Sequence, residues 1–300
     1  MTPRFRTILI GCIVLTGLCW SVTSRAEREA ASGLYEGLTG ASLSDLPGLK
    51  NLEMMLGGWM SMGVTYNGNN PSDHSNAPVT FNDRSSEFQL NQLDLFIERP
   101  VNKEAKRWDV GGRLDFLWGT DSRFTQAAGN WDEGLITQSD LRFYDIALPQ
   151  AYAEIATPFV RGATAKIGHF YTILGVEAVP SPNNFFYSHS YAMQYGEPFT
   201  HTGVLLSYPV KESLTVSAGA VTGPHEKMDN FDKHLSNWNF LGGLTWVSED
   251  GATSFALALT SGATDDKAGD NRTIASLVLN HDLTEKLHYI IQHDQGYQAR

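Results

Sequence analysis

Hydrophobic and polar residues alternate with a period of two along much of the chain. In the segment Trp108–Trp118 nearly all even positions are apolar, whereas the odd positions include Asp109, Arg113 and Asp115. Successive side chains of a strand point to opposite faces, so this segment predicts a strand with one apolar and one charged face. Such a strand spans about 33 Å, and a tilt of about 40° lowers this to about 25 Å. This is the height of the apolar band on an outer-membrane barrel.

Tryptophan residues stand at both ends of two such segments. Trp108 and Trp118 bracket the first segment, and Trp238 and Trp246 bracket a later one. An indole combines an apolar ring with an N–H group that needs a polar partner at headgroup depth. We therefore predict that all four rings point outward at the rims of an apolar band.

The same reasoning predicts about eleven strands from Met54 onward, and no stretch shows sustained helical periodicity. The predicted strands are Met54–Tyr66, Glu87–Arg99, Trp108–Trp118, Gln150–Thr157, Gly162–Phe170, His201–Tyr208, Leu214–Thr222, Trp238–Val247, Ser254–Thr260, Thr273–Asn280 and Leu287–Asp294.

Short and long connections alternate between these strands. The short ones are Pro100–Arg107, Pro158–Arg161, Pro209–Ser213, Ser248–Ala252 and Asp282–Lys286, and the long ones are Asn67–Ser86, Gly119–Pro149, Tyr171–Thr200, Gly223–Asn237 and Ser261–Arg272. This rhythm is typical of an up-and-down meander with tight periplasmic turns and long external loops. We predict an all-β fold, a transmembrane antiparallel up-and-down β-barrel over residues 54–300. A soluble β-sandwich or propeller is the alternative.

The first residues resemble an export signal. Arg4 and Arg6 precede the apolar stretch Thr7–Trp20, and small residues around Ala26 suit a signal peptidase. We expect a signal peptide over residues 1–26 and a polar segment over residues 27–53. A lipobox ending at Cys12 is the alternative reading, although it leaves little apolar sequence before the cysteine.

Composition narrows the possible functions. Both cysteines, Cys12 and Cys19, lie within the expected signal, so the mature chain would have no disulfide, thiolate metal site or cysteine nucleophile. The formal charge of −11 becomes −14 when the signal, with three arginines and no acid, is removed. An acidic chain without basic clusters argues against a nucleic-acid partner.

If the apolar faces meet lipid, the opposite faces line a lumen. The expected pore-lining residues are Asp94, Glu98, Asp109, Arg113, Asp115, Tyr152, Glu154 and Lys166. Charges of both signs with acids in excess would set the ion preference of a water-filled channel through their field. The alternative is a packed salt-bridge network inside a narrow, plugged barrel.

The segment Tyr171–Thr200 is rich in aromatic residues, Asn, Pro and Ser. In one interpretation it folds into the lumen and narrows it, with Asn184, Tyr187 and His189 at the constriction. In the other it is an external loop packed against its neighbours.

Three runs in this part of the chain carry a family resemblance. They are Gly168–Glu177, Asn183–Ser190 and Glu197–Val204, which read GHFYTILGVE, NNFFYSHS and EPFTHTGV. Together they resemble the central signature of the β-barrel porin family described as OmpL-like, and the likeness extends over most of the chain from about Met54. The resemblance implies an outer-membrane barrel and a channel, and it brings no catalytic residue with it.

The end of the chain departs from the usual pattern of these barrels. Outer-membrane barrels usually close on an aromatic residue and have an even strand count. This chain has about eleven predicted strands and stops at Gln298-Ala299-Arg300. We expect C-terminal strands to be missing, and hence a gap between the first and last strands, although an overlooked strand would also explain the count.

These observations predict a porin for passive diffusion of small hydrophilic solutes or ions, without enzymatic activity, cofactor or metal. The expected partners are outer-membrane lipids and lipopolysaccharide, and association with further copies of the chain is left open. A barrel lipase or protease is the rival class, with Ser188–Ser190 and His201 supplying suitable residue types. A non-conducting structural or receptor barrel is the other alternative.

Overall fold

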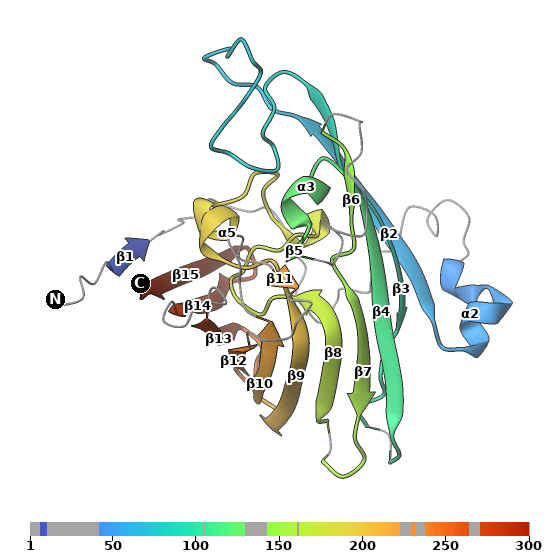
Figure 1. The fold of residues 1–300 in the computed structure, drawn as a ribbon. Helices are drawn as coiled ribbons and strands as arrows, with labels where there is room; N and C mark the ends of the chain where they lie inside the picture. The colour runs from blue at the N-terminus through green and yellow to red at the C-terminus, as the bar shows by residue number, and fades with distance from the viewer. Residues whose placement is uncertain are drawn as a thin grey trace.

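The protein forms one large antiparallel β-sheet that curves around its own long loops (Figure 1). The computed structural model describes residues 7–10, 42–104, 106–129, 143–160, 162–222, 230–231, 238–263 and 271–299. Within these ranges no helix has the length and apolar character needed to cross a membrane.

All eleven predicted strands are present, and their ends differ from the prediction by at most four residues. They are β2 (Met55–Val64), β3 (Phe88–Arg99), β4 (Asp109–Gly119), β7 (Ala151–Ala156), β8 (Thr164–Tyr171), β9 (Thr200–Lys211), β10 (Leu214–Thr222), β12 (Trp238–Val247), β13 (Thr253–Ala263), β14 (Asn271–Thr284) and β15 (Leu287–Gln298). The alternation of apolar and polar residues therefore identified the elements correctly.

Each of these strands pairs antiparallel with the next one along the chain, from β2 to β15. The short strand β6 (Asp145–Ala147) extends the pairing of β4, and β1 (Thr7–Ile10) pairs with the end of β15. A two-stranded sheet of β5 (Ala128–Gly129) and β11 (Asn230–Phe231) lies apart. β2 and β15 stand at opposite sides of this succession and do not pair within the described residues, as expected. The predicted up-and-down topology is confirmed.

The described parts of the long connections lie at one end of the sheet, and the short turns lie at the other. At the short-turn end, for example, residues 212–213 join β9 to β10. Short helices sit in and before the connections: η2 (Leu43–Asp45) and α2 (Pro47–Asn51) precede β2, and α3 (Ser122–Thr125), η3 (Ser181–Asn183) and α5 (Tyr191–Gly196) belong to long loops. Figure 1 shows α3 and α5 within the curve of the sheet.

Burial in this sheet is inverted relative to a soluble protein. On β4 the apolar residues Val110, Leu114 and Phe116 are 56%, 49% and 40% exposed, whereas Asp115 is fully buried on the concave face. Other strands repeat the pattern, with Leu206 exposed on β9 and Asn239 buried on β12. A broad exposed apolar face of this kind is stable in contact with lipid and unfavourable in contact with water. The soluble sandwich is therefore wrong for this chain.

Two apolar clusters lie inside the curve, between the wall and the loops. One joins the wall residues Leu205, Leu241 and Ile274 to Leu174 of the long connection after β8. The other surrounds Phe81, which contacts residues of several different loops. The concave side is thus filled by loop residues at the level of these clusters.

Neighbouring residues on β10 offer a direct test of which face meets lipid. Val216 points outward, and Ser217 points inward, where its hydroxyl lies 2.9 Å from that of Ser207. In a Cys12→Ser, Cys19→Ser background, a spin label at Val216→Cys should collide with oxygen, which dissolves in lipid. A label at Ser217→Cys should collide with a water-soluble nickel chelate. Equal accessibility of the two sites would contradict the assignment of faces.

Phe81 should be a main stabilising residue of the loop cluster. It is 1% exposed and packs against Phe124 and Phe199 at ring distances of 5.4 and 5.7 Å. Phe81→Ala should lower the free energy of unfolding by about 3–5 kcal/mol, because a large buried ring leaves a cavity. Urea titration in detergent micelles measures this loss. Tyr66→Ala, whose ring is 77% exposed, is the control and should have little effect.

Candidate functional site: the inner wall and the segment that crosses it

The centre of the charged inner wall is Arg113 on β4. Its guanidinium binds Asp115 through two hydrogen bonds of 2.6 and 3.1 Å and Glu98 on β3 through one of 2.9 Å. It also lies over the ring of Phe96, 3.9 Å from the ring centroid. A Cβ at Gly57 would lie 2.4 Å from that ring, so β2 leaves room for it only as glycine. Arg113 is thus held by neighbours on two strands.

Asp94 and Asp115 are the two most enclosed acids of the predicted pore lining. Asp115 accepts a further hydrogen bond of 3.0 Å from Gln150, and it has no contact with solvent. Asp94 is 1% exposed, and neither of its carboxylate oxygens has a hydrogen-bond partner among the described residues. Both carboxylates are therefore buried in the wall instead of facing an open channel.

The remaining predicted lining residues of β7 and β8 are half-buried and face the same side. Glu154 lies opposite Lys166 in the strand register. The Lys166 ammonium lies 4.2 Å from the centroid of the Tyr152 ring, a cation–π arrangement. Together with Glu98 and Arg113, these side chains form the part of the charged wall that solvent reaches.

Asp109 is placed differently from the other predicted lining residues. It lies at the start of β4, where its carboxylate accepts hydrogen bonds of 3.0 Å from Arg99 and 2.6 Å from the N–H of Asn102. Arg99 also donates to Glu53 ahead of β2. Asp109 therefore braces the short turn between β3 and β4, at the short-turn mouth of the barrel.

Residues 172–199, which we call the strap, cross the concave side of the sheet. Near its start, Gly175 N–H donates to the Ser276 hydroxyl on β14 at 3.1 Å, and Val176 N–H donates to Gln292 on β15 at 3.0 Å. Farther on, the strap contacts β3, at the opposite side of the sheet. Of the two interpretations of this segment, its contacts with β14, β15 and β3 favour the one in which it lies on the concave side of the sheet.

The contacts with β3 use neutral amides and a phenol. Gln92 donates to the carbonyl of Val179 at 2.8 Å and accepts from the N–H of Ser181 at 3.0 Å. The Tyr187 hydroxyl donates to Asn91 at 2.8 Å, and its ring fills the space above Gly63 of β2. Of the three proposed constriction residues, Tyr187 is the one that contacts the wall.

Asn184 and His189 hold the strap together from within. Asn184 closes a turn, because its amide accepts from the N–H of Ala178 at 2.9 Å and donates to the carbonyls of Ala178 and Pro180. His189 lies 3.1 Å from Glu177 and 4.5 Å, between ring centroids, from Phe81. Burial opposes ionisation, but hydrogen bonds with His189 and Ser190 lower the pKa of Glu177.

The residues considered for a hydrolytic site have structural contacts. The Ser190 hydroxyl accepts from the N–H of Met193 and so caps α5, while His201 pairs with the Thr172 hydroxyl at 3.0 Å. Ser188 is exposed. In the described part of the chain, moreover, no three His, Cys, Asp or Glu side chains cluster closely enough to hold a metal ion.

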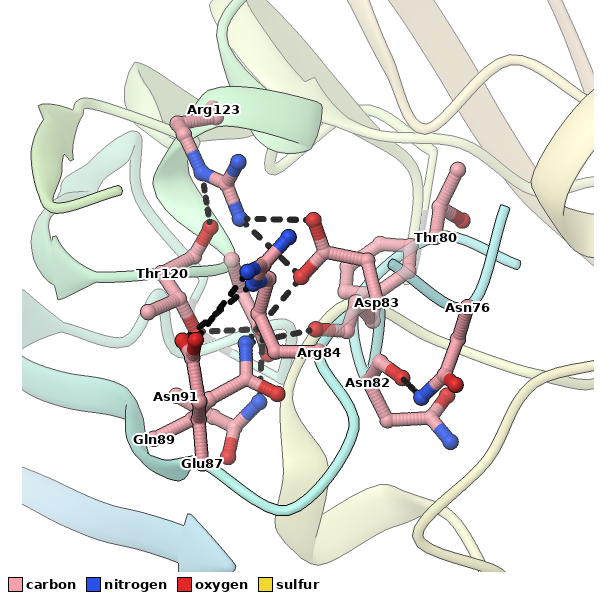
Figure 2. A network of polar contacts seen from close by, with 12 residues as sticks. Asn76, Thr80, Asn82, Asp83, Arg84, Glu87, Gln89, Asn91, Thr120 and Arg123 are labelled. Carbon is pink, nitrogen blue, oxygen red and sulfur yellow. Dashed lines mark hydrogen bonds and ion pairs between the residues drawn. The ribbon is translucent and has the colours of Figure 1, made fainter. Parts of the chain in front are cut away.

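A polar network fixes the loop between β2 and β3 against α3, and the sequence did not predict it. Figure 2 shows Asp83 at its centre, where it receives Arg123 at 3.2 Å and Gln89 at 3.1 Å. Beside it, Arg84 pairs with Glu87 at 3.0 Å. The sequence shows opposite charges in these two distant loops, which could have suggested an ion pair. It does not show that the two loops are in contact.

The four predicted interface tryptophans lie at the ends of their strands. Trp108 and Trp246 are at the short-turn end, and Trp118 and Trp238 are at the long-loop end. All but Trp118 are exposed; Trp118 is half-buried because it stacks on Tyr144 at 5.3 Å between ring centroids. A further tryptophan, Trp59, points inward and donates to Gln92 at 2.7 Å.

Comparison with known proteins defines the family. No curated protein sequence matches the chain. Residues 53–300 match the family described as "Putative beta-barrel porin-2, OmpL-like". The matched range includes every strand from β2 to β15 and both apolar clusters. With an all-antiparallel meander, an apolar outer face and a polar inner face over the same residues, the chain belongs to this OmpL-like β-barrel porin family.

Proposed function

We propose that this protein is an outer-membrane porin that lets small hydrophilic solutes or ions diffuse passively. The observation that carries the proposal is the inverted burial, with exposed apolar side chains outside and charged side chains inside a continuous antiparallel sheet. Membership of a β-barrel porin family supports it. In this proposal residues 1–26 export the chain, and the apolar belt contacts outer-membrane lipid and lipopolysaccharide.

The proposed path narrows at the strap and widens toward the short turns. On that side the inner wall carries half-buried hydroxyls and amides, such as Ser217 on β10 and the Asn280–Ser254 pair at 3.1 Å. The half-buried charges of this wall are Glu98, Arg113, Glu154 and Lys166. A polar, partly charged vestibule of this kind favours hydrated solutes over apolar ones.

We infer a mild preference for cations. Among the predicted lining residues, acids outnumber bases. The acids Glu98, Asp109 and Glu154 keep partial contact with solvent, as do the bases Arg113 and Lys166. Asp94 and Asp115 are buried away from solvent, and Asp115 is paired with Arg113. The solvent-reaching acids are therefore the better residues with which to test selectivity.

We propose passive transport and no catalysis, because three of the four candidate residues, His189, Ser190 and His201, have structural contacts, and the fourth, Ser188, is exposed. His189 is bound to Glu177, the Ser190 hydroxyl caps a helix, and His201 is fully buried against Thr172. A hydrolase would need a serine hydroxyl within hydrogen-bond reach of a free imidazole nitrogen.

Charge substitutions at Glu154 and Lys166 should change ion selectivity in opposite directions. A unit charge about 10 Å from a permeating ion contributes about 0.4 kcal/mol in water, roughly a two-fold change in an ion ratio. Glu154→Gln should lower the cation-to-anion permeability ratio by about this factor, and Lys166→Gln should raise it. Reversal potentials in planar bilayers under a salt gradient measure both.

The two variants lie opposite each other on the same wall, so each serves as the matched control for the other. Changes in the same direction would contradict a shared luminal field. Failure of the chain to conduct, together with ester or peptide hydrolysis lost in His189→Ala, would replace the porin by an enzyme.

A further inference from the structure

The two ends of the strap meet the wall at one place on β14 and β15. Gly175 and Val176 dock there through their N–H groups, and Glu197 returns to the same spot at the far end of the strap. Gly175 has a positive φ of 74°, and a Cβ on it would lie 1.9 Å from a Glu197 carboxylate oxygen. The Glu197 carboxyl is thus packed directly onto the beginning of the strap.

Gln292 of β15 joins three groups at this place. Its carbonyl oxygen accepts from the N–H of Val176, and its amide nitrogen donates to Glu197 and, at 2.6 Å, to Asp294. Glu197 is 4% exposed and Asp294 is 7% exposed. Two carboxyl groups, one from the strap and one from the wall, therefore share a single neutral amide in a buried position.

The charged groups that act on Glu197 are acids. Glu177 of the strap and Asp294 of β15 both act on it as negative charges. On β14 its neighbour is the neutral Ser276, and Arg272, four residues farther along, is bonded to Gln298. α5 contributes two exposed phenols, Tyr191 and Tyr195, and no charged side chain.

Two buried, adjacent carboxylates without a cation cannot both be ionised at a reasonable cost. Burial, the charge of Asp294 and a hydrogen bond between the two carboxyls raise the pKa of Glu197 to about 8. At neutral pH the group is therefore a neutral acid, and one proton holds the pair together.

We propose that Glu197, Gln292 and Asp294 form a proton-dependent latch that holds the strap across the lumen and releases it from β15 when Glu197 ionises. The claim that the latch controls permeation rests on the proposed porin function. The claim that the strap is released from β15 with rising pH does not depend on that function.

The direction of the pH effect follows from linkage. The bound strap raises the pKa of Glu197 above that of the carboxyl free in water, so binding is favoured at low pH and lost as pH rises through about 8. The released-to-bound ratio should rise about ten-fold per pH unit between the pKa of the free and of the bound carboxyl, and level off above the latter.

A spin label at Val176→Cys tests the latch on the full chain with Cys12 and Cys19 replaced by Ser. The Val176 side chain is exposed while its N–H is bound to Gln292, so a label reports docking without replacing a contact. The label should be restricted at pH 6 and mobile at pH 9. In Glu197→Gln, which stays neutral, it should remain restricted at both pH values.

Two further variants separate the latch from general effects of pH. Asp294→Asn removes the opposing acid and should weaken the transition, which keeps the test decisive if Glu197→Gln does not fold. Glu249→Gln, in the exposed turn between β12 and β13, should behave like the wild type. Equal mobility at pH 6 and pH 9 in the wild type, or an unchanged transition in Glu197→Gln, would overturn the proposal.

Conductance recorded over the same pH range distinguishes this inference from the proposed function. If the label responds to pH and no variant conducts, the latch stands and the porin function fails. If the chain conducts and the label does not respond, the porin function stands and the latch fails.

Discussion

In the apolar part of a membrane, no water is present to bind the N–H and C=O groups of the backbone, so neighbouring strands must satisfy one another. Continuous antiparallel pairing from β2 to β15 meets this requirement with a local topology in which each strand follows its partner in sequence. Contact with lipid instead of water also places apolar side chains on the outer face. Polar side chains can then remain only on the concave face, where each needs a partner of its own.

Gln92 shows how the strap provides such partners. Its oxygen accepts from the Trp59 indole and the N–H of Ser181, and its amide nitrogen donates to Asp121 and the carbonyl of Val179. All four hydrogen-bonding positions of this fully buried amide are therefore used. Since a buried amide left without partners costs stability, the wall and the strap are mutually dependent. The inner wall is polar, yet much of it faces protein.

The sequence predicted the strands well because alternation is a local signal. Leu214–Thr222 and Trp238–Val247 were predicted to the residue, and the errors elsewhere fall at strand ends, where the loops take over. It also predicted which side each β4 residue faces.

The sequence did not predict the contacts on the concave side of the sheet. Whether Gln92 faced water or a covering loop depended on where residues 172–199 lie, and no periodicity encodes that. Strand parity placed Arg113 and Asp115 on one face, but the contacts of Asp115 with Gln150 and of Asp83 with Arg123 join segments far apart in sequence.

The two attachments of the strap differ in chemistry, and this difference gives them separate roles. At β3 the strap is held by Gln92, Asn91 and Tyr187, two amides and a phenol that stay neutral over the physiological range; burial moves the pKa of Tyr187 to about 12. Within the strap, Glu177 is ionised and bound to His189 and Ser190, which stabilises its fold independently of the wall. At β15 the attachment includes, besides the N–H of Val176, two carboxyl groups that repel when both are ionised. A strap fixed at one side by neutral groups and at the other by acids can be released at one side without unfolding. This separation of a permanent from a conditional contact allows a loop inside a rigid barrel to move.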